Sequence, residues 1–598
     1  MLDTARILAW QRAITARISE RGQALIRRIP ALGVDESTLL IAFAVAIGAA
    51  VGLAVLIFYS LIDLSQRLAL SAAGSLTVIG SLSIAVVTIA GVGLTRLLVR
   101  WGAADSDGSN IPDVMRAVAK GGGIIHSIPA GIKTVGSAIL IGTGGSVGAE
   151  GPVAVAGSAL GSRIGRFFRS GPARLKVLVA CGAAAGISAA FNAPIAGVFF
   201  SLEKVLGSFG ASAFPPILVA SVIAATVSRT ALGNTPVIDI PQTYGLGHPI
   251  EFFFYGILGI ATGIVAVMYT RSIYGTGDLL GRLGQRWKQV AVAGAAVAAL
   301  NIIFRADLWG QGHETLDVGI ISERAWYFLL ALAFAKLLAT SFTVSAARCG
   351  GLFTPALFIG ATLGGGLAAA GNRYLGLELV PEAFALAGMA GFVAAATHAP
   401  LTAIMIVFEM TNDYELILPI MLCGAIAYIT GRRIYPESVY SEWLRRRGET
   451  IAHGTDTAVL ERLRVRGNFN GDPHVIGESA TVDQLLQAIS ASTQTEFPVV
   501  DQQLRFRGML TYNDLRRVLT DAEKLGPLVV AGDLVDENPT TVSPEDSLRT
   551  ALQRLAVRGT HYIPVVDSAD PERLLGLIGR QDVFTAYDRA LLQQEGSG

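Results

Sequence analysis

The chain is poor in charge and in cysteine for its length. Only 16% of its 598 residues are charged, and the charges balance to a formal net charge of +1. Such a balance offers no basic surface to nucleic acid, so we expect no nucleic-acid partner. The three cysteines lie in apolar segments without metal-ligand spacing, which predicts buried core residues and excludes a disulfide framework. They are Cys181, Cys349 and Cys423.

Catalytic and metal-binding patterns are also missing. The seven histidines form no HExxH or other metal-ligand spacing, and no Walker sequence is present. A membrane enzyme would need such a constellation. We therefore expect no enzymatic activity, no bound metal and no obligatory cofactor.

Long uncharged apolar runs fill the first three quarters of the chain. Hydrophobic residues make up 52% of the sequence, and the mean hydropathy is +0.52. Each run is about long enough to cross a hydrocarbon core of roughly 30 Å as a helix, which needs about 20 residues. The sequence therefore predicts an integral, multi-pass protein of the lipid bilayer. The runs are 39–62, 68–95, 177–202, 252–270, 349–372 and 383–408.

Arginines flank the apolar part at both of its ends. A polar stretch of more than thirty residues, with six arginines, precedes the first run and is too long for a cleaved signal peptide. Arg432 and Arg433, and then 445–447, follow the last run. Arginine near a membrane segment favours the cytoplasmic side. We therefore expect both termini in the cytoplasm and the cell (inner) membrane as the location.

The composition changes near residue 445, where the apolar runs stop and charged, glycine-containing sequence begins. This change predicts an N-terminal cytoplasmic segment, a transmembrane domain, a linker and a soluble tail made of two parts. Their expected bounds are 1–37, 38–445, 446–469 and 470–598, with the two parts of the tail at about 470–522 and 530–590.

The tail repeats itself. FPVVD at 497–501 recurs as IPVVD at 563–567, and each copy is followed by a glycine and then by an aspartate six residues later. A segment with helical periodicity precedes each of them, at 482–490 and 547–557. Two copies of a helix, strand, strand, helix unit are predicted.

The membrane part is duplicated as well. Residues 182–203 align without a gap to 388–409, and a cluster of glycine and proline precedes each copy, at 148–152 and 350–355. Glycine and proline breaks inside apolar repeats are typical of transporters built from interrupted helices. A helix that begins inside the membrane offers unpaired N–H groups and about half a positive charge, so it binds an anion without trapping it.

Four ordered sequences resemble the signatures of the CLC chloride channels and chloride/proton antiporters. They are GSNIP at 108–112, GAEGP at 148–152, GGLFTP at 350–355 and VYSEWL at 439–444. The resemblance implies an all-α polytopic membrane fold of about eighteen helices in two inverted halves. It also implies a homodimer with one pore per subunit, and chloride and similar small anions as substrates.

The same resemblance implies a central chloride site made of neutral donors. These are the hydroxyls of Ser109 and Tyr440 and the backbone amides of Leu352 and Phe353. Ser109 also suits a helix N-cap before Pro112, and the two roles are compatible. Tyr440 alone also suits an aromatic anchor at the membrane interface.

Glu150 is an ionisable residue flanked by glycines and a proline in an apolar region, where burial is costly. By resemblance it is the gating glutamate, whose carboxylate occupies the anion path until protonation or chloride displaces it. The alternative is a carboxylate that only stabilises a helix N-terminus.

Lys204 departs from the family pattern. Antiporters of the family usually carry a proton-relaying glutamate there, and in this sequence Glu203 precedes the lysine. A fixed positive charge repels protons, which favours passive, channel-like conduction. Lys204 can instead pair with Glu203 or face cytoplasmic water, so coupled chloride/proton antiport stays open as the alternative. A cation channel regulated by the tail is a remote third hypothesis, because it requires more pore carboxylates.

The tail resembles a tandem pair of cystathionine-beta-synthase (CBS) domains, an α/β unit. In that family a hydroxyl and an aspartate after the second strand hold the ribose of an adenine nucleotide, and Thr511 with Asp514 match this pattern. The second copy keeps Asp582 but has Gly579 in place of the hydroxyl. The pattern is thus complete only in the first copy, which makes an adenine nucleotide a candidate ligand of the tail. The alternative is that these residues only cap a helix, with Asp514 near its N-terminus.

Overall fold

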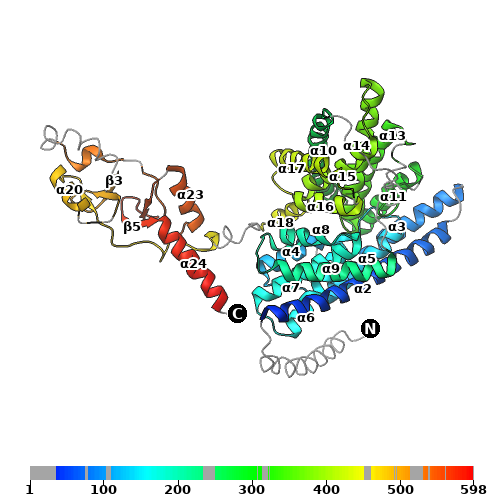
Figure 1. Cartoon of the computed structure of the whole chain (residues 1–598), viewed down its shortest axis with the longest axis horizontal. Coiled ribbons are helices and arrows are strands. Elements are labelled where there is room, and N and C mark those ends of the chain that lie inside the picture. The colour runs from blue at the N-terminus through cyan, green and yellow to red at the C-terminus, as the bar shows by residue number, and fades with distance from the viewer. Residues whose placement is uncertain are drawn as a thin grey trace. The chain divides into compact units, whose positions relative to one another are not determined.

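The structure is a computed structural model of the chain, and it divides into two compact units, Met1–Ile451 and Ala452–Gly598 (Figure 1). The residues that it describes are 36–73, 78–102, 110–233, 249–305, 307–312, 321, 323–411, 413–449, 460–490, 492, 494–511, 529–536, 539–558, 560–596.

The first unit consists of helices in its described part. Eight of these helices are long and apolar enough to cross a membrane. Prolines begin several of them, because the fixed φ of proline suits the first turn and its missing N–H leaves no hydrogen bond unmade there. The helices are α2 (Glu36–Ala73), α3 (Val78–Gly102), α4 (Asn110–Lys120), α5 (Ser127–Gly142), α6 (Glu150–Phe167), α7 (Pro172–Phe191), α8 (Pro194–Phe200), the π-helix η2 (Ser201–Leu206), α9 (Phe214–Leu232), α10 (Glu251–Gly281), α11 (Arg286–Ile303), α13 (Trp326–Ala347), α14 (Phe353–Leu375), α15 (Pro381–Thr397), α16 (Pro400–Thr411), α17 (Ile417–Ile434) and α18 (Ser441–Arg446).

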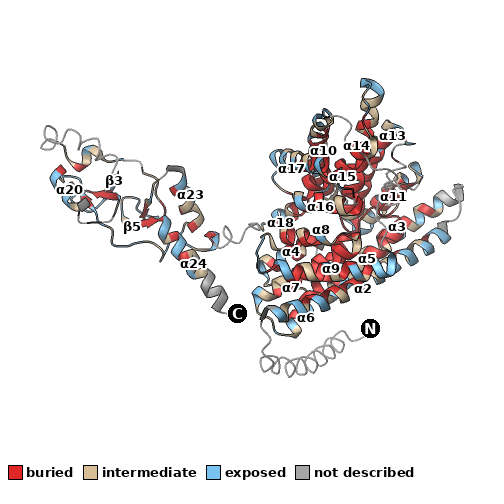
Figure 2. Cartoon of the chain, viewed as in Figure 1, coloured by how far each residue is buried: buried red, intermediate tan, exposed pale blue. Residues whose placement is uncertain are grey.

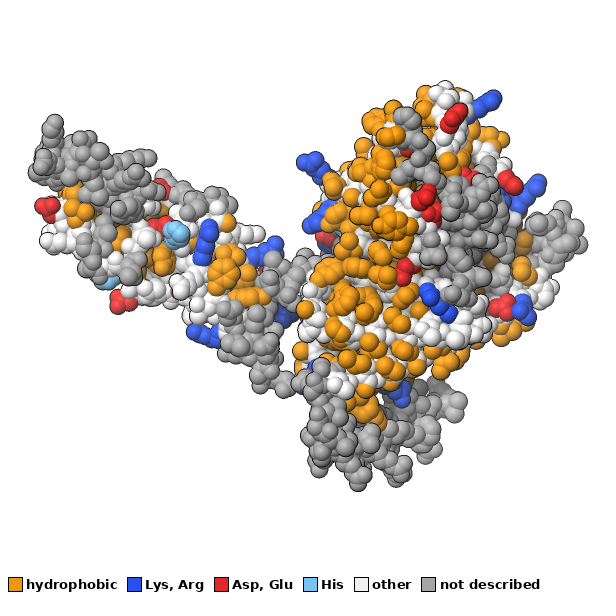
Figure 3. All heavy atoms as spheres, in the orientation of Figure 1, with side chains coloured by type: hydrophobic (Ala, Val, Ile, Leu, Met, Phe, Trp, Pro, Cys, Tyr) orange, Lys and Arg blue, Asp and Glu red, His pale blue; other side chains and the backbone are white. Residues whose placement is uncertain are grey.

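Large apolar side chains cover the outside of this unit. Leu53, Ile57 and Leu82 are each more than half exposed, and hydrophobic atoms dominate the face shown in Figure 3. Buried residues gather inside this unit (Figure 2), and α7 and α14 are the most buried of the eight candidate spans. An apolar exterior around a packed interior is the arrangement that a protein surrounded by lipid requires.

Glycines at equivalent positions form the same close helix–helix contact in each half of the membrane unit. A Cβ at Gly182 of α7 would collide with the backbone carbonyl of Gly157 in α6. A Cβ at Gly388 of α15 would collide in the same way with the carbonyl of Gly360 in α14. Small residues let two helix backbones approach closely where lipid offers no hydrophobic driving force. The sequence repeat is therefore also a repeat of helix packing.

Both halves break their helices at equivalent places. Asn192 ends α7 and His398 ends α15, each in the left-handed region, with φ of 56° and 55°. Asparagine and histidine adopt this conformation more readily than most residues. After the break the halves differ, because α8 continues into the π-helix η2, whereas α16 is an α-helix throughout.

The second unit is an α/β tail with an internal repeat. In the first copy, β1 (Ile476–Gly477) runs parallel to β2 (Glu496–Val500), which pairs antiparallel with β3 (Phe506–Thr511). In the second copy, β4 (Tyr562–Val566) pairs antiparallel with β5 (Leu574–Gly579). The helices are α20 (Val482–Ser490), α23 (Leu548–Arg558) and α24 (Arg580–Gly596), with a 3-10 turn η4 (Ala531–Leu534).

The predicted elements of this repeat are confirmed where they are described, and the second helix of the first copy would lie in 512–528, outside the described residues. The helix expected at 482–490 is α20, and the helix expected at 547–557 is α23, shifted by one residue. A buried carboxylate joins the two copies, because Glu496 of β2 accepts hydrogen bonds from the backbone N–H groups of His561 at 3.0 Å and Tyr562 at 2.6 Å.

Candidate functional site in the membrane unit

Glu150 is completely buried inside the membrane unit. It is the first residue of α6, yet its carboxylate is bound by the start of α14. Its Oε1 accepts the backbone N–H of Phe353 at 2.5 Å, and its Oε2 accepts the hydroxyl of Thr354 at 2.8 Å. The N-terminus of α14 thus holds a carboxylate with neutral donors, as a helix N-terminus holds an anion.

Two glycines make room for this carboxylate. Gly148 and Gly351 exchange both of their backbone hydrogen bonds, each at 2.9 Å, and so join the segments that lead into α6 and α14. A Cβ on either glycine would overlap the carboxylate of Glu150. Only glycine therefore lets the two helix starts enclose this group.

Tyr440 precedes α18, and its side chain is buried. Its hydroxyl has no hydrogen-bond partner among the described residues, and it is close enough to Glu150 to interact with its charge. A buried hydroxyl without a partner carries a desolvation cost of about 1–3 kcal/mol, which a bound ligand relieves. This hydroxyl is thus an unused donor near the carboxylate.

Tyr269 and Thr354 are parts of the site that sequence reasoning missed. Tyr269 of α10 is buried and donates its hydroxyl to the carbonyl of Leu352 at 3.0 Å, which fixes the residue before α14. Thr354 lies inside the GGLFTP sequence, so its position was a signal for its role. Tyr269 lies in an apolar run with no distinguishing spacing, and nothing in the sequence marks it.

The structure brings together three of the predicted residues, Glu150, Leu352 and Phe353, at the start of α14. Tyr440 is buried and interacts electrostatically with Glu150. Ser109 lies outside the described residues, just before α4, so its chloride-binding role stays a prediction.

Glu203 and Lys204 lie in the π-helix η2. The carboxylate of Glu203 binds the start of α16, where Oε2 accepts the backbone N–H of Thr402 at 3.0 Å and its hydroxyl at 2.7 Å. Lys204 is only 3% exposed, so the interpretation that it faces open water is wrong in this structure. The carboxylate of Glu203, the residue next to Lys204, is therefore already hydrogen-bonded to the start of α16.

Glu409 repeats this arrangement from the other half. Its two carboxylate oxygens accept the backbone N–H groups of Ile195 at 2.9 Å and Ala196 at 2.7 Å, in the first turn of α8. Glu203 and Glu409 are equivalent in the sequence repeat, and each satisfies the free N–H groups of the helix that carries the other. These two carboxylates therefore form reciprocal hydrogen bonds between the two halves.

The tail residues proposed for nucleotide binding are only partly described. Thr511 ends β3 and is half-buried, and Asp514 lies outside the described residues. Asp582 accepts the backbone N–H of Gly579 at 2.8 Å at the start of α24. This bond is a helix-capping contact, the alternative role considered for it.

Family models match both units of the chain. The model described as "Voltage gated chloride channel" matches residues 89–432, and the CBS domain model matches 468–521 and 531–589.

Three curated relatives illustrate the range of names among similar proteins. The chain is 33% identical over 374 residues to a putative chloride channel protein ClcB-like of Ralstonia nicotianae, covering 61% of this chain and 86% of the relative. It is 28% identical over 546 residues to chloride channel protein CLC-f of Arabidopsis thaliana, covering 76% and 68%. It is 31% identical over 359 residues to the H(+)/Cl(-) exchange transporter ClcA of Citrobacter koseri, covering 58% and 75%.

Solved structures share the fold. A slow cyanobacterial Cl-/H+ antiporter superposes with a TM-score of 0.63 at 24% identity, covering 69% of this chain and 98% of that one. A eukaryotic CLC transporter superposes with a TM-score of 0.62 at 20% identity, covering 92% of this chain and 99% of that one.

Proposed function

Because the chain belongs to the voltage-gated chloride channel (CLC) family, whose members transport anions, we propose that it conducts chloride through a pore gated by Glu150. We further propose that this conduction is not coupled to protons. The fold class expected from the sequence is confirmed, with an all-helical multi-pass membrane unit and a C-terminal CBS pair. Family membership leaves the cation-channel hypothesis without support.

The observation that carries the proposal is the carboxylate of Glu150 at the N-terminus of α14. The donors around it are neutral: the amide of Phe353, the hydroxyl of Thr354 and, nearby, the unpartnered hydroxyl of Tyr440. Chloride carries the same charge as a carboxylate and accepts hydrogen bonds from the same donors. When the carboxylate is protonated or displaced, these donors become available to chloride.

The charge at position 204 supports uncoupled conduction. Lys204 is buried where antiporters of the family usually carry a glutamate, and the neighbouring Glu203 is bound to α16. A proton route along this path has no free carboxylate at this point. Coupled antiport remains the second candidate, because the Citrobacter relative and the cyanobacterial structure carry antiporter names.

The resemblance to the same family also supports proposals on assembly, orientation and regulation. We propose a homodimer with one pore per subunit, with both termini in the cytoplasm and the cell membrane as its location. The CBS pair is proposed to bind an adenine nucleotide. Calorimetry of the full chain with ATP, ADP and AMP tests this, and the absence of any binding heat contradicts it.

The deciding experiment measures the reversal potential of purified protein in liposomes. A chloride gradient is imposed first, and a pH gradient is then added to it. Uncoupled conduction predicts a reversal at the chloride Nernst potential, about 59 mV per tenfold gradient, with no shift when the pH gradient is added. Proton movement driven uphill by chloride contradicts the proposal and supports antiport.

A further inference from the structure

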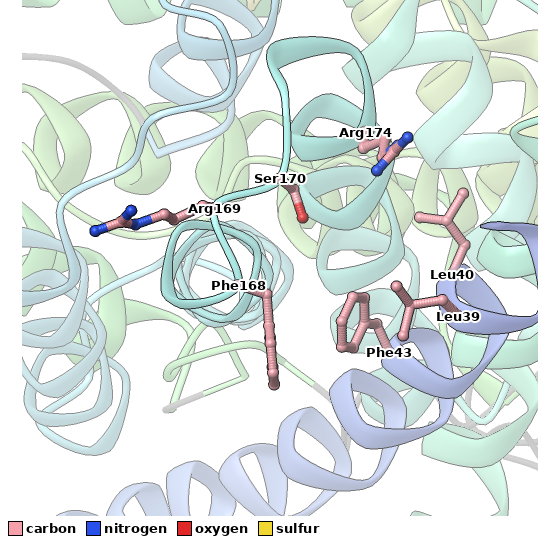
Figure 4. A pocket seen from close by; sticks show the side chains of 7 residues that line it. All are labelled: Leu39, Leu40, Phe43, Phe168, Arg169, Ser170 and Arg174. Atoms are coloured by element: carbon pink, nitrogen blue, oxygen red, sulfur yellow. The ribbon is translucent and has the colours of Figure 1, made fainter. Parts of the chain in front are cut away.

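A small cavity lies at one end of the first spanning helix, between the start of α2 and the turn that joins α6 to α7. Its volume is about 80 Å³. Apolar side chains from α2 and the end of α6 form one side, and the polar turn forms the other (Figure 4). The lining residues are Leu39, Leu40, Phe43, Phe168, Arg169, Ser170 and Arg174.

The polar side of this cavity presents two different donors. In Figure 4 the hydroxyl of Ser170 points into the space beside Phe168, and the guanidinium of Arg174 lies apart from it, on the side of Leu40 of α2. Arg169 extends the other way from the same turn. A guanidinium and a hydroxyl that line the same cavity suit the oxygens of a phosphate group, because both donate hydrogen bonds and one carries charge.

The turn on one side of the cavity is strongly basic, whereas Glu36 begins α2 on the other side. The stretch 163–176 contains four arginines and one lysine and no acidic residue. α7 begins at Pro172 in this turn, so its N-terminus adds partial positive charge. Basic residues clustered at the end of spanning helices are typical of the cytoplasmic side. The lipid leaflet on that side is the one that carries anionic headgroups.

The apolar side of the cavity lies at the boundary of the hydrocarbon layer. Leu39 and Leu40 occupy the first turn of the candidate span Thr38–Ser71. Ile41 and Val45 on the same helix are about two-fifths exposed. Phe43 stacks on Phe168, with ring centroids 4.5 Å apart, and joins α2 to the end of α6. A headgroup held at this depth leaves its acyl chains beside an exposed apolar helix face.

We propose that this cavity binds the headgroup phosphate of an anionic phospholipid of the cytoplasmic leaflet. Arg174 and Ser170 hold the phosphate oxygens, and the basic turn selects anionic over zwitterionic headgroups, because it repels a choline cation. The acyl chains lie along the exposed face of α2. This site is separate from the anion pathway and does not depend on its proposed gating.

Native mass spectrometry of the full chain in detergent tests this proposal. The probes are phosphatidylglycerol and phosphatidylcholine with the same acyl chains. For the native protein we expect several-fold more bound phosphatidylglycerol than phosphatidylcholine. Arg174→Gln should lose this preference, and Ser170→Ala should weaken it. The matched control is Arg282→Gln, which removes an exposed arginine at the end of α10 and leaves the preference unchanged. Equal binding of the two lipids, or equal loss in Arg174→Gln and Arg282→Gln, overturns the site.

Two further measurements complete the test. One distinguishes a lipid site from a site for free anions, and the other tests whether the cavity is the binding place. Millimolar glycerol phosphate leaves phosphatidylglycerol bound if the site is a lipid site, and its displacement of the lipid identifies a site for free anions instead. Leu40→Trp fills the cavity and keeps every charge. Leu40→Trp should abolish the preference for phosphatidylglycerol, whereas Arg174→Lys should largely keep it. If Leu40→Trp keeps the preference, the cavity is not the binding place.

Discussion

Glu150 and Phe353 occupy equivalent places in the two halves of the membrane unit, and the side chain of the first is bound to the backbone of the second. Each begins its helix, and each stands two residues before a proline. The paired glycines Gly148 and Gly351 bring the two helix starts together. One half of the repeat thus supplies a carboxylate and the other supplies the amide that holds it. The site is a product of the duplication, in which only one copy carries the charge.

The first prediction concerns the charge of Glu150. Glu150→Gln keeps the size of the side chain and removes its negative charge, so chloride no longer competes with a carboxylate. We expect chloride flux to persist and to become independent of pH, whereas native flux rises on acidification by up to about tenfold per pH unit, the limit for one titrating proton. Flux assays in liposomes between pH 4.5 and 7.5 measure this.

Glu382→Gln is the control for this variant. Glu382 also lies in the first turn of a helix, α15, but not at the site. Its replacement should leave the pH profile native. A folded Glu150→Gln protein with no chloride flux shows that Glu150 is not the gate.

The second prediction concerns the hydroxyl of Tyr440. Tyr440→Phe removes a buried donor that has no partner in the described part of the chain. The loss of one neutral hydrogen bond is worth about 0.5–1.5 kcal/mol, so chloride affinity should fall by roughly two- to tenfold. Calorimetric titration with chloride measures this. Tyr255→Phe, a buried tyrosine stacked on Phe384, is the control and should bind chloride as the native protein does. Native affinity in both Tyr440→Phe and its double variant with Ser109→Ala contradicts the site.

Much of the fold was readable from the sequence because it depends on local patterns. Apolar runs predicted the spanning helices, and glycine and proline clusters predicted their interruption. The repeated FPVVD and IPVVD segments predicted β2 and β4, because a short β-branched run after an amphipathic helix indicates a strand from local sequence alone.

Three features of the site were not readable, for a common reason. The binding of Glu203 to α16, the hydrogen bond from Tyr269 to Leu352 and the burial of Lys204 all depend on contacts between distant segments. Hydropathy reports how apolar a segment is, but it does not report which face meets which neighbour. The π-helix η2 likewise has no sequence signature in its six residues.

The third prediction concerns the cross-capping of the two halves. Glu409→Ala leaves the backbone N–H groups of Ile195 and Ala196 without their acceptor at the start of α8. The expected destabilisation is about 1–2 kcal/mol, as for the loss of a helix cap. Thermal unfolding in detergent measures it, with exposed Glu415→Ala as the control. An unchanged unfolding midpoint in Glu409→Ala means that α8 does not depend on this carboxylate.

The fourth prediction concerns the tail. Glu496→Ala removes the carboxylate that accepts the N–H groups of His561 and Tyr562, so these two amides should exchange hydrogen faster while those in α20 change little. Hydrogen exchange of the full chain measures this. Glu545→Ala removes an exposed carboxylate paired with Arg466 and serves as the control. Unaltered protection of the two amides in Glu496→Ala contradicts the joining role of Glu496.

The last prediction concerns Lys204, because it distinguishes a channel from an antiporter. The π-turn at Lys204 has no counterpart in the other half, where the equivalent residue is Met410 in a regular helix. A buried positive charge disfavours a proton beside it, and each pKa unit of such an interaction, about 1.4 kcal/mol, lowers the protonated population of a relay roughly tenfold. Lys204→Glu should therefore introduce a shift of the reversal potential with pH. Lys204→Met copies the other half, removes the charge and supplies no carboxylate, so its reversal should stay at the chloride potential. If Lys204→Met gains the same pH-dependent shift as Lys204→Glu, the lysine acts only as a barrier and protons reach Glu150 by a route without a carboxylate at this position.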